Sequence, residues 1–428
     1  MRGVDVSAPR VWRVLATAWL CLLASQARAG AMSPCSNPTV FDADVQVHIF
    51  PFSTDKALSN EARALATLLQ RHVLFAALKY PSIGVQELVD DHSPCGFRQV
   101  AGRISSRLKP QQTAIFLSGR IFEQDGRIYL KNFVAVKAPK SKLAIQWKLA
   151  DDAQATVTTQ IPIEIDGFAP RTIPLSFLER LAPSQLQARR VHREPNEQSP
   201  FQELPDGTRD RYTFLVFEAR DDWMRVRVMP FGVEGWIPAH ALASGQAMKG
   251  EFPELYFVDA LVGYFSMGGN GERDRRVLGL THASFDQYLN VTEGRAEPDT
   301  RALALVLKGN ARLHAVGAEW PTSTLSAARA DYAHASAESP SWTPAQAHLL
   351  ACDSLLCVRG ACEGRGASLE AGYLEAIARD PLSAELVDGL GAYYQAAKLE
   401  RLATGLSAES LQIRAQKVQG VQARMPTR

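Results

Sequence analysis

The chain has 428 residues, 46% of them hydrophobic, and a formal charge of +2. This length accommodates about two or three domains. The first 29 residues contribute +3, from four arginines and one aspartate, so the remainder carries −1. Such a balance leaves no electrostatic footprint for nucleic acid or an anionic membrane surface, and it excludes proteins that bind these polyanions through overall charge.

The amino terminus has the pattern of a signal peptide. Arg2, Arg10 and Arg13 precede an apolar run over residues 14–24, which is shorter than a transmembrane span. Ala27-Arg28-Ala29 then forms a small-x-small cleavage site. We expect cleavage after Ala29 and a periplasmic or secreted protein without an integral membrane span. An uncleaved amino-terminal anchor is the alternative.

The cysteines fit an exported protein, because disulfides are the default in an oxidising compartment. Cys21 leaves with the leader. A bridge between Cys35 and Cys95 would close a loop of about sixty residues, worth roughly 4 kcal/mol. The other disulfide candidates cluster near the carboxyl end: Cys352, Cys357 and Cys362. Five mature cysteines leave one unpaired, and we expect it in this cluster.

Residues 30–180 have the pattern of an α/β domain. Val45, Val47 and Ile49 alternate with polar residues and predict a strand. Leucines at helical spacing predict a helix after the capping residues Ser59 and Asn60, and a second helix is expected over residues 96–108. Residues 113–137 predict two strands joined at Asp125-Gly126, a dipeptide typical of hairpin turns.

This segment resembles the TolB-like amino-terminal domain of envelope proteins. The matching features are a strand ending in Phe50-Pro51-Phe52, a long amphipathic helix, and a hairpin beginning "FLSGRI" around Gly119. The resemblance covers about a hundred residues and implies assembly or docking instead of catalysis. Residues 141–174 are also strand-rich and are expected to complete the sheet of this domain. Residues 175–200 predict a helix that runs into a linker.

Residues 187–244 have the pattern of a small β-barrel. Strands are expected over residues 212–218, 223–229 and 235–238, with Val226 and Val228 on one face and Arg225 and Arg227 on the other. The two motifs Trp223-Met224-Arg225-Val226 and Gly235-Trp236-Ile237-Pro238 resemble the "W-x-x-V" and "G-W-[IV]-P" signature of bacterial Src-homology-3-like domains. That family binds short peptides or cell-wall stems along an aromatic groove.

The resemblance makes the aromatic residues of this segment candidates for ligand binding, against the alternative that they form the barrel core. Core packing is the first expectation for Trp236. For Trp223, at the start of the hairpin beside two aspartates, a half-exposed ligand platform and a core position both stay open. The ligand-binding candidates are Tyr212, Trp223, Arg225 and Trp236.

Residues 251–428 are expected to be helical. Leu369, Tyr373, Ala376 and Pro381 have the spacing of the second helix of a tetratricopeptide repeat, and Leu390-Gly391 with Tyr394 resembles the start of the next repeat. The resemblance implies a short, irregular α-solenoid with a protein-binding face. An ordinary helical bundle is the alternative. Residues 266–277 are expected to form a long glycine-containing loop.

The sequence offers no catalytic constellation. It lacks H-E-x-x-H, G-x-S-x-G and a phosphate-binding loop. The cysteine spacing is not that of a zinc site, so we expect neither a metal nor a cofactor. We therefore expect an α+β multidomain, non-enzymatic adaptor that binds an envelope protein, a peptide or a peptidoglycan stem, and no nucleic acid. The alternative is a cell-wall hydrolase that uses the barrel for targeting.

Overall fold

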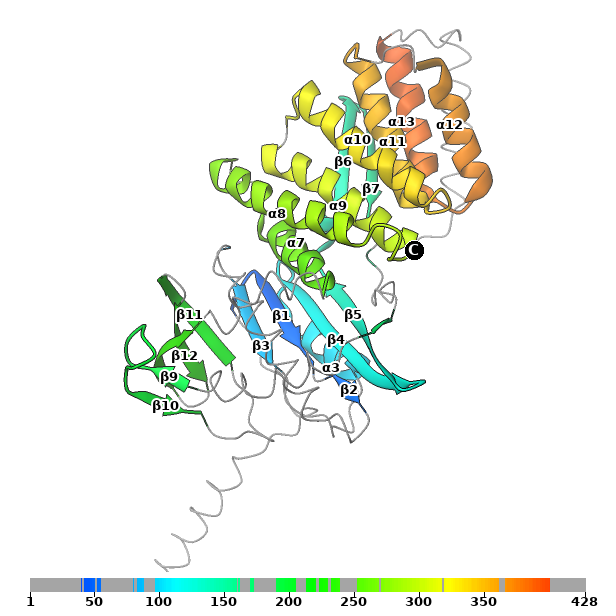
Figure 1. The fold of residues 1–428 in the computed structure, drawn as a ribbon. Helices are drawn as coiled ribbons and strands as arrows, with labels where there is room; N and C mark the ends of the chain where they lie inside the picture. The colour runs from blue at the N-terminus through cyan, green and yellow to red at the C-terminus, as the bar shows by residue number, and fades with distance from the viewer. Residues whose placement is uncertain are drawn as a thin grey trace, which may run out of the picture.

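The computed structural model is a mixed α and β protein with a helical carboxy-terminal region (Figure 1). It describes residues 40, 42–50, 52–54, 80, 83–87, 97–159, 161, 170–172, 190–204, 213–220, 223–229, 232–238, 252–268, 271–317, 319–361 and 366–400. Several of the predictions fall outside these residues. They concern the leader, the helix after Asn60, the helix and linker before residue 190, and the single residues Tyr212, Cys35, Cys95 and Cys362.

The first part of the sheet contains parallel strands and one long hairpin. Its elements are β1 (Val45–Ile49), β2 (Ser53–Thr54), β3 (Ile83–Glu87), α3 (Phe97–Ser105), β4 (Thr113–Gln124), β5 (Arg127–Lys137) and β8 (Arg171–Thr172). β1 lies between β3 and β4 and is parallel to both. At the β4–β5 turn Asp125 and Gly126 have φ angles of 53° and 69°, as a type I′ turn requires. The predicted strand, hairpin and second helix are confirmed.

The strands expected to form a barrel continue this sheet. β9 (Arg190–His192), β10 (Phe201–Glu203), β11 (Thr213–Arg220), β12 (Trp223–Met229) and β13 (Val233–Pro238) follow the order β10-β9-β13-β12-β11 and are antiparallel. β11 then pairs with β3 through Thr213–Gln86 and Phe214–Val85. β10 and β11 therefore lie at opposite ends of this set, and the described strands belong to one larger sheet.

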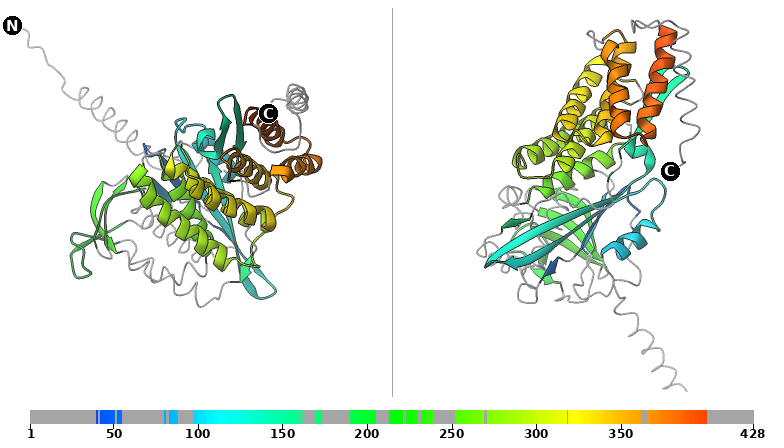
Figure 2. Two further views of the ribbon diagram at one scale, coloured as in Figure 1. Left: turned by 90° about the horizontal axis from the view of Figure 1, so that it is seen from above. Right: turned by 90° about the vertical axis from the view of Figure 1, so that its right-hand side faces the viewer.

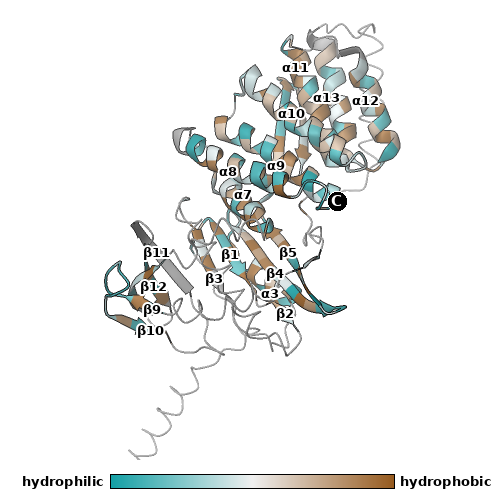
Figure 3. Ribbon diagram, viewed as in Figure 1, coloured by the Kyte–Doolittle hydropathy of each residue, from teal (hydrophilic) through white to brown (hydrophobic). Residues whose placement is uncertain are grey.

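The carboxy-terminal helices rise from one end of the sheet (Figures 1 and 2). They are α7 (Glu254–Ser266), α8 (Gly271–Val291), α9 (Pro298–Val316), α10 (Thr322–Glu338), α11 (Thr343–Val358), α12 (Gly366–Arg379) and α13 (Ala384–Glu400). α7 lies nearest the sheet, contacts β1 and β4, and is buried and hydrophobic along most of its length (Figure 3). The expected long loop after Ser266 is wrong, because α8 already begins at Gly271.

Ion pairs join successive helices of this region. Lys308 on α9 binds Asp286 on α8 at 2.7 Å and Asp331 on α10 at 3.3 Å. Arg329 on α10 binds Asp353 on α11 at 2.5 Å. Asp331 and Asp353 are largely buried. Each of these carboxylates therefore needs its cationic partner to offset the hydration that it loses on burial.

The last two helices contain the residues that resemble a tetratricopeptide repeat. Tyr373 and Leu390 are buried, and the Tyr394 hydroxyl donates a hydrogen bond to Glu370 at 2.6 Å, which joins α13 to α12. Of the clustered cysteines, Cys357 is in a disulfide whose partner lies outside the described residues. Cys352 is not in a disulfide; its buried thiol donates to the carbonyl of Leu325 at 3.4 Å.

The hairpin formed by β6 (Ala144–Ala150) and β7 (Ala153–Thr158) is the main departure from expectation. It does not complete the first sheet but forms a two-stranded sheet of its own. After the short helix α4 (Lys140–Leu143) it enters the helical region and packs against α11 and α13, with Trp147 fully buried. The prediction that residues 141–174 belong to the first sheet is therefore wrong for this segment.

The described helices include none with the length and hydrophobicity needed to cross a bilayer.

Gly235 is required by the close approach of β13 to β9. A Cβ atom at this position would lie 2.4 Å from the carbonyl oxygen of His192. We predict that Gly235→Ala lowers the free energy of unfolding by about 1–3 kcal/mol, because the backbone must shift to admit the methyl group. Urea titration followed by tryptophan fluorescence measures the loss.

The matched control is Gly279→Ala on the exposed side of α8, where a Cβ meets no atom within 4 Å. This change should be neutral or stabilise the protein by up to about 1 kcal/mol. Equal effects of the two substitutions would contradict the prediction.

Candidate functional site

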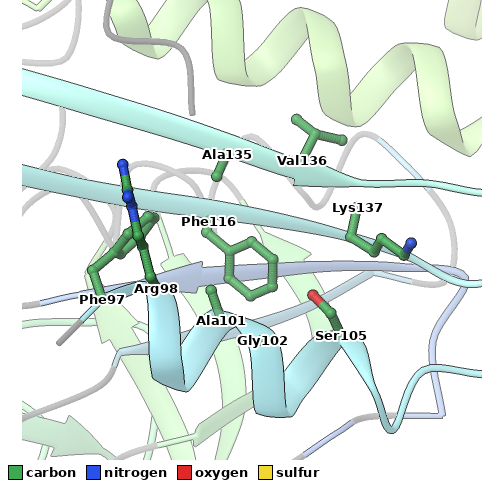
Figure 4. A pocket seen from close by; sticks show the side chains of 9 residues that line it. All are labelled: Phe97, Arg98, Ala101, Gly102, Ser105, Phe116, Ala135, Val136 and Lys137. Atoms are coloured by element: carbon green, nitrogen blue, oxygen red, sulfur yellow. The ribbon is translucent and has the colours of Figure 1, made fainter. Parts of the chain in front are cut away.

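A groove of about 590 Å³ lies between α3 and the β4–β5 hairpin (Figure 4). On α3 the groove is lined by Arg98, Ala101, Gly102 and Ser105, which have the spacing of one helix face. Three of these side chains are small or absent, and a Cβ atom on Gly102 would meet nothing within 4 Å. The helix therefore leaves open space where a larger residue would fill it.

The sheet side of the groove is aromatic and firmly packed. Phe116 of β4 is 2% exposed and lies beside Ala135 of β5. His48 of β1 stacks on the Phe116 ring at 5.5 Å, and Phe50 meets the rings of Phe97 and Phe116 edge-on at 4.7 and 6.2 Å. Because these contacts fix the rings before any ligand arrives, little ordering entropy would be lost on binding.

Two cations lie at the ends of the groove. Figure 4 shows Arg98 at the amino-terminal end of α3 and Lys137 at the opposite end, beside Ser105. The described lining contains no His, Cys, Asp or Glu. No group of three metal-binding side chains occurs in the part of the chain that the structure describes. The described lining of the groove is therefore an apolar surface with positive ends.

The tryptophans that suggested a ligand site are buried. Trp223 is 8% exposed and Trp236 is 9% exposed, so neither offers an open ring. Arg225, the third described candidate, is exposed on β12, where its guanidinium lies 4.0 Å from the carboxylate of Glu234. The register brings Arg225 directly opposite Trp236, and Trp223 lies opposite Pro238.

An exposed aromatic residue lies close to Trp223 on the neighbouring strands. Phe201 of β10 is 44% exposed, and the Arg190 guanidinium lies 4.4 Å from its ring centroid. His192 separates this ring from Trp223, at 5.4 Å from Phe201 and 5.2 Å from Trp223. The sequence signal was weak, because Phe201 follows a proline in a polar segment and has no neighbour that marks it.

A buried polar network holds the β6–β7 hairpin in the helical region. Thr159, directly after β7, accepts a hydrogen bond from the Asn310 side chain at 2.9 Å and contacts Nε2 of His348 at 2.9 Å. The Tyr332 hydroxyl donates to Asn310 at 2.7 Å, and its ring stacks on His348 at 5.0 Å. The network joins α9, α10 and α11 to the single residue that follows the hairpin.

Burial favours the neutral form of two histidines of this region, His348 and His314. Desolvation lowers the pKa of His348 to about 3. Desolvation, with repulsion from Lys142, lowers the pKa of His314 to about 4. Both side chains pack against aromatic rings, His348 against Trp147 and Tyr332, and His314 against Tyr264. We interpret the network as a structural element, because Thr159, Asn310, Tyr332 and His348 are all fully buried.

Comparison of the chain with protein-family models, with curated proteins and with solved structures finds no match. The functional argument therefore depends on the geometry of the chain itself.

Acid should destabilise the protein through these histidines. Their pKa is near 6.5 in the unfolded chain and lower in the folded protein, so protonation favours the unfolded state. The stability they contribute is complete above about pH 6.5 and is lost as the pH falls toward the folded pKa. In the unmodified protein the unfolding free energy should fall as the pH is lowered from roughly 6 to 4.5. We predict that His348→Gln makes this slope smaller by about 1.4 kcal/mol per pH unit.

The measurement is urea unfolding at a series of pH values. The matched control is His334→Gln, because His334 lies on α10 with its side chain exposed to solvent. The control should keep the slope of the unmodified protein. An unchanged slope in His348→Gln would show that His348 is not buried and neutral in the folded state.

Proposed function

We propose that the mature protein is a non-catalytic, exported adaptor that binds a protein or peptide segment in the groove between α3 and the β4–β5 hairpin. The observation that carries this proposal is the groove itself. Its volume lies within the range of roughly 300–1,000 Å³ that ligand sites occupy, and its lining is largely apolar with a few polar groups at the ends. Such a lining suits side chains of a peptide.

The signal-peptide pattern of residues 1–29 supports an envelope or extracellular location, where the ligand is an envelope protein, a free peptide or a peptidoglycan stem. The TolB-like features of the first domain support docking as its role. The resemblance of residues 187–244 to bacterial Src-homology-3-like domains and of the last helices to tetratricopeptide repeats supports further contacts with the same partner. Linked weak contacts raise the overall affinity through effective concentration.

A cell-wall hydrolase remains the competing class of function. That activity needs a nucleophile with a base within hydrogen-bond reach. No observation on the described residues favours it over binding.

Gly102 provides the sharpest test of the groove. We predict that Gly102→Phe fills the groove and lowers the affinity for its ligands by at least roughly 10-fold, equivalent to about 1.4 kcal/mol. Gly102→Ala is the matched control, since a Cβ fits here without contact and alanine favours a helix. Ligands come from selection of a displayed random-peptide library on the unmodified mature protein, and affinities from calorimetry on all three proteins.

Loss of binding in Gly102→Phe with retention in Gly102→Ala supports the proposal. Equal binding of the selected peptides to all three proteins would place recognition elsewhere. Failure to select any peptide would contradict peptide binding as the function.

A further inference from the structure

The groove continues into a wider surface on the β4–β5 hairpin. Side chains on one face of this hairpin alternate with those on the other. The face that packs against α3 includes Ala114, Phe116 and Ala135. The register places Ser118, Arg120 and Phe122 of β4, opposite Phe133, Lys131 and Tyr129 of β5, on the same face. Figure 1 shows the hairpin extending beyond α3, so this part of the face is not covered by that helix.

This face alternates rings and cations. The Arg120 guanidinium lies 5.3 Å from the ring centroid of Phe122, and the Lys131 ammonium lies 5.5 Å from that of Phe133. Phe122 stacks on Tyr129 at 5.5 Å with an interplanar angle of 16°. The Arg120–Lys131 pair therefore lies between Phe133 and the stacked rings of Phe122 and Tyr129.

The charges on this face are all of one sign. Arg120 and Lys131 are direct cross-strand partners, an arrangement in which like charges repel. Lys137 is exposed at the α3 end of β5, and Arg98 lies on α3. Neither α3 nor this face of the hairpin between residues 114–122 and 129–137 carries an aspartate or glutamate. An anionic ligand would complement Arg120 and Lys137, the two exposed cations on this face.

We propose that this surface selects an acidic, extended peptide segment in which carboxylate residues alternate with apolar ones. The inference rests on the proposed function and specifies the ligand of the same site. An extended chain of about eight residues matches the distance from Lys137 to Tyr129, roughly 27 Å at about 3.4 Å per residue. Its apolar side chains enter the groove beside Phe116 and its carboxylates face Arg120 and Lys137.

A peptide fits this surface better than other polyanions do. The groove between Ala101, Phe116 and Ala135 is apolar, and a sulfated glycan or a nucleic acid backbone has no aliphatic side chain to place in it. The mature chain carries a net charge of about −1 and so lacks the overall positive field typical of proteins that bind nucleic acid.

The test uses three capped eight-residue peptides that alternate leucine and alanine with Glu, Gln or Lys, titrated into the mature full-length protein by calorimetry. We expect the Glu peptide to bind at least roughly 10-fold more tightly than the Lys peptide at low salt, with the preference shrinking as ionic strength rises. Arg120→Glu and Lys137→Glu should each weaken the Glu peptide by roughly 10-fold. Both residues are exposed, so the fold should persist.

Lys148→Glu is the matched control, because Lys148 undergoes the same change of charge on the exposed side of β6, in the helical region. It should leave the affinity for the Glu peptide within about 2-fold. Circular dichroism of each variant checks the fold.

Equal binding of the Glu and Lys peptides would overturn the proposed selectivity while leaving peptide binding intact. The selectivity is overturned in the same way if library-selected peptides bind but the Glu peptide does not. Binding of dextran sulfate that is lost in Arg120→Glu, without binding of the Glu peptide, would assign the surface to anionic polysaccharide instead. If the library also yields no peptide that binds, the proposed function itself fails.

Discussion

The contact of the β6–β7 hairpin with α9, α10 and α11 is the constraint on which the rest of the structure depends. Thr159 is the hydrogen-bonding partner of Asn310 and His348, and Trp147 fills the space beside Tyr332. The buried hydroxyl and amide are tolerated in this apolar setting because they bond to each other and to Tyr332, while the imidazole contributes one ring nitrogen and keeps its buried Nδ1 without a hydrogen-bond partner among the described residues. The β6–β7 hairpin follows β5 of the main sheet in the sequence but packs within the helical region. It therefore links the main sheet to the helices.

The local elements could be predicted from the sequence wherever the residues of one short stretch are enough to specify the element. Asp125-Gly126 between two alternating runs specifies the β4–β5 hairpin, and the alternation from Trp223 to Met229 specifies β12. The pattern around Trp147 likewise predicts a strand, yet it does not say what covers that strand. Its partners on α10 and α11 lie more than 150 residues away in the chain, and no local pattern records such a contact.

The candidate site was hidden for a related reason. Trp223 and Trp236 drew attention because large aromatic residues mark both cores and binding surfaces, yet both side chains are buried. The groove instead depends on what α3 lacks. No sequence motif marks the three small residues of α3, Ala101, Gly102 and Ser105. They form one wall of a groove only because the register of β4 and β5 places Phe116 and Ala135 opposite them. An expectation drawn from conspicuous residues passes over such a surface.

The position of the β6–β7 hairpin also bears on the order in which the chain can fold. Thr159 is separated from Asn310 by 151 residues and from His348 by 189. Contacts of this separation form late, because a long loop must close before they can stabilise anything. During synthesis the hairpin emerges well before α9 to α13, so Trp147 and its apolar neighbours stay exposed until nearly the whole chain has been made. The β6–β7 hairpin, which links the main sheet to the helical region, therefore exposes apolar side chains for most of synthesis and needs protection from aggregation during that time.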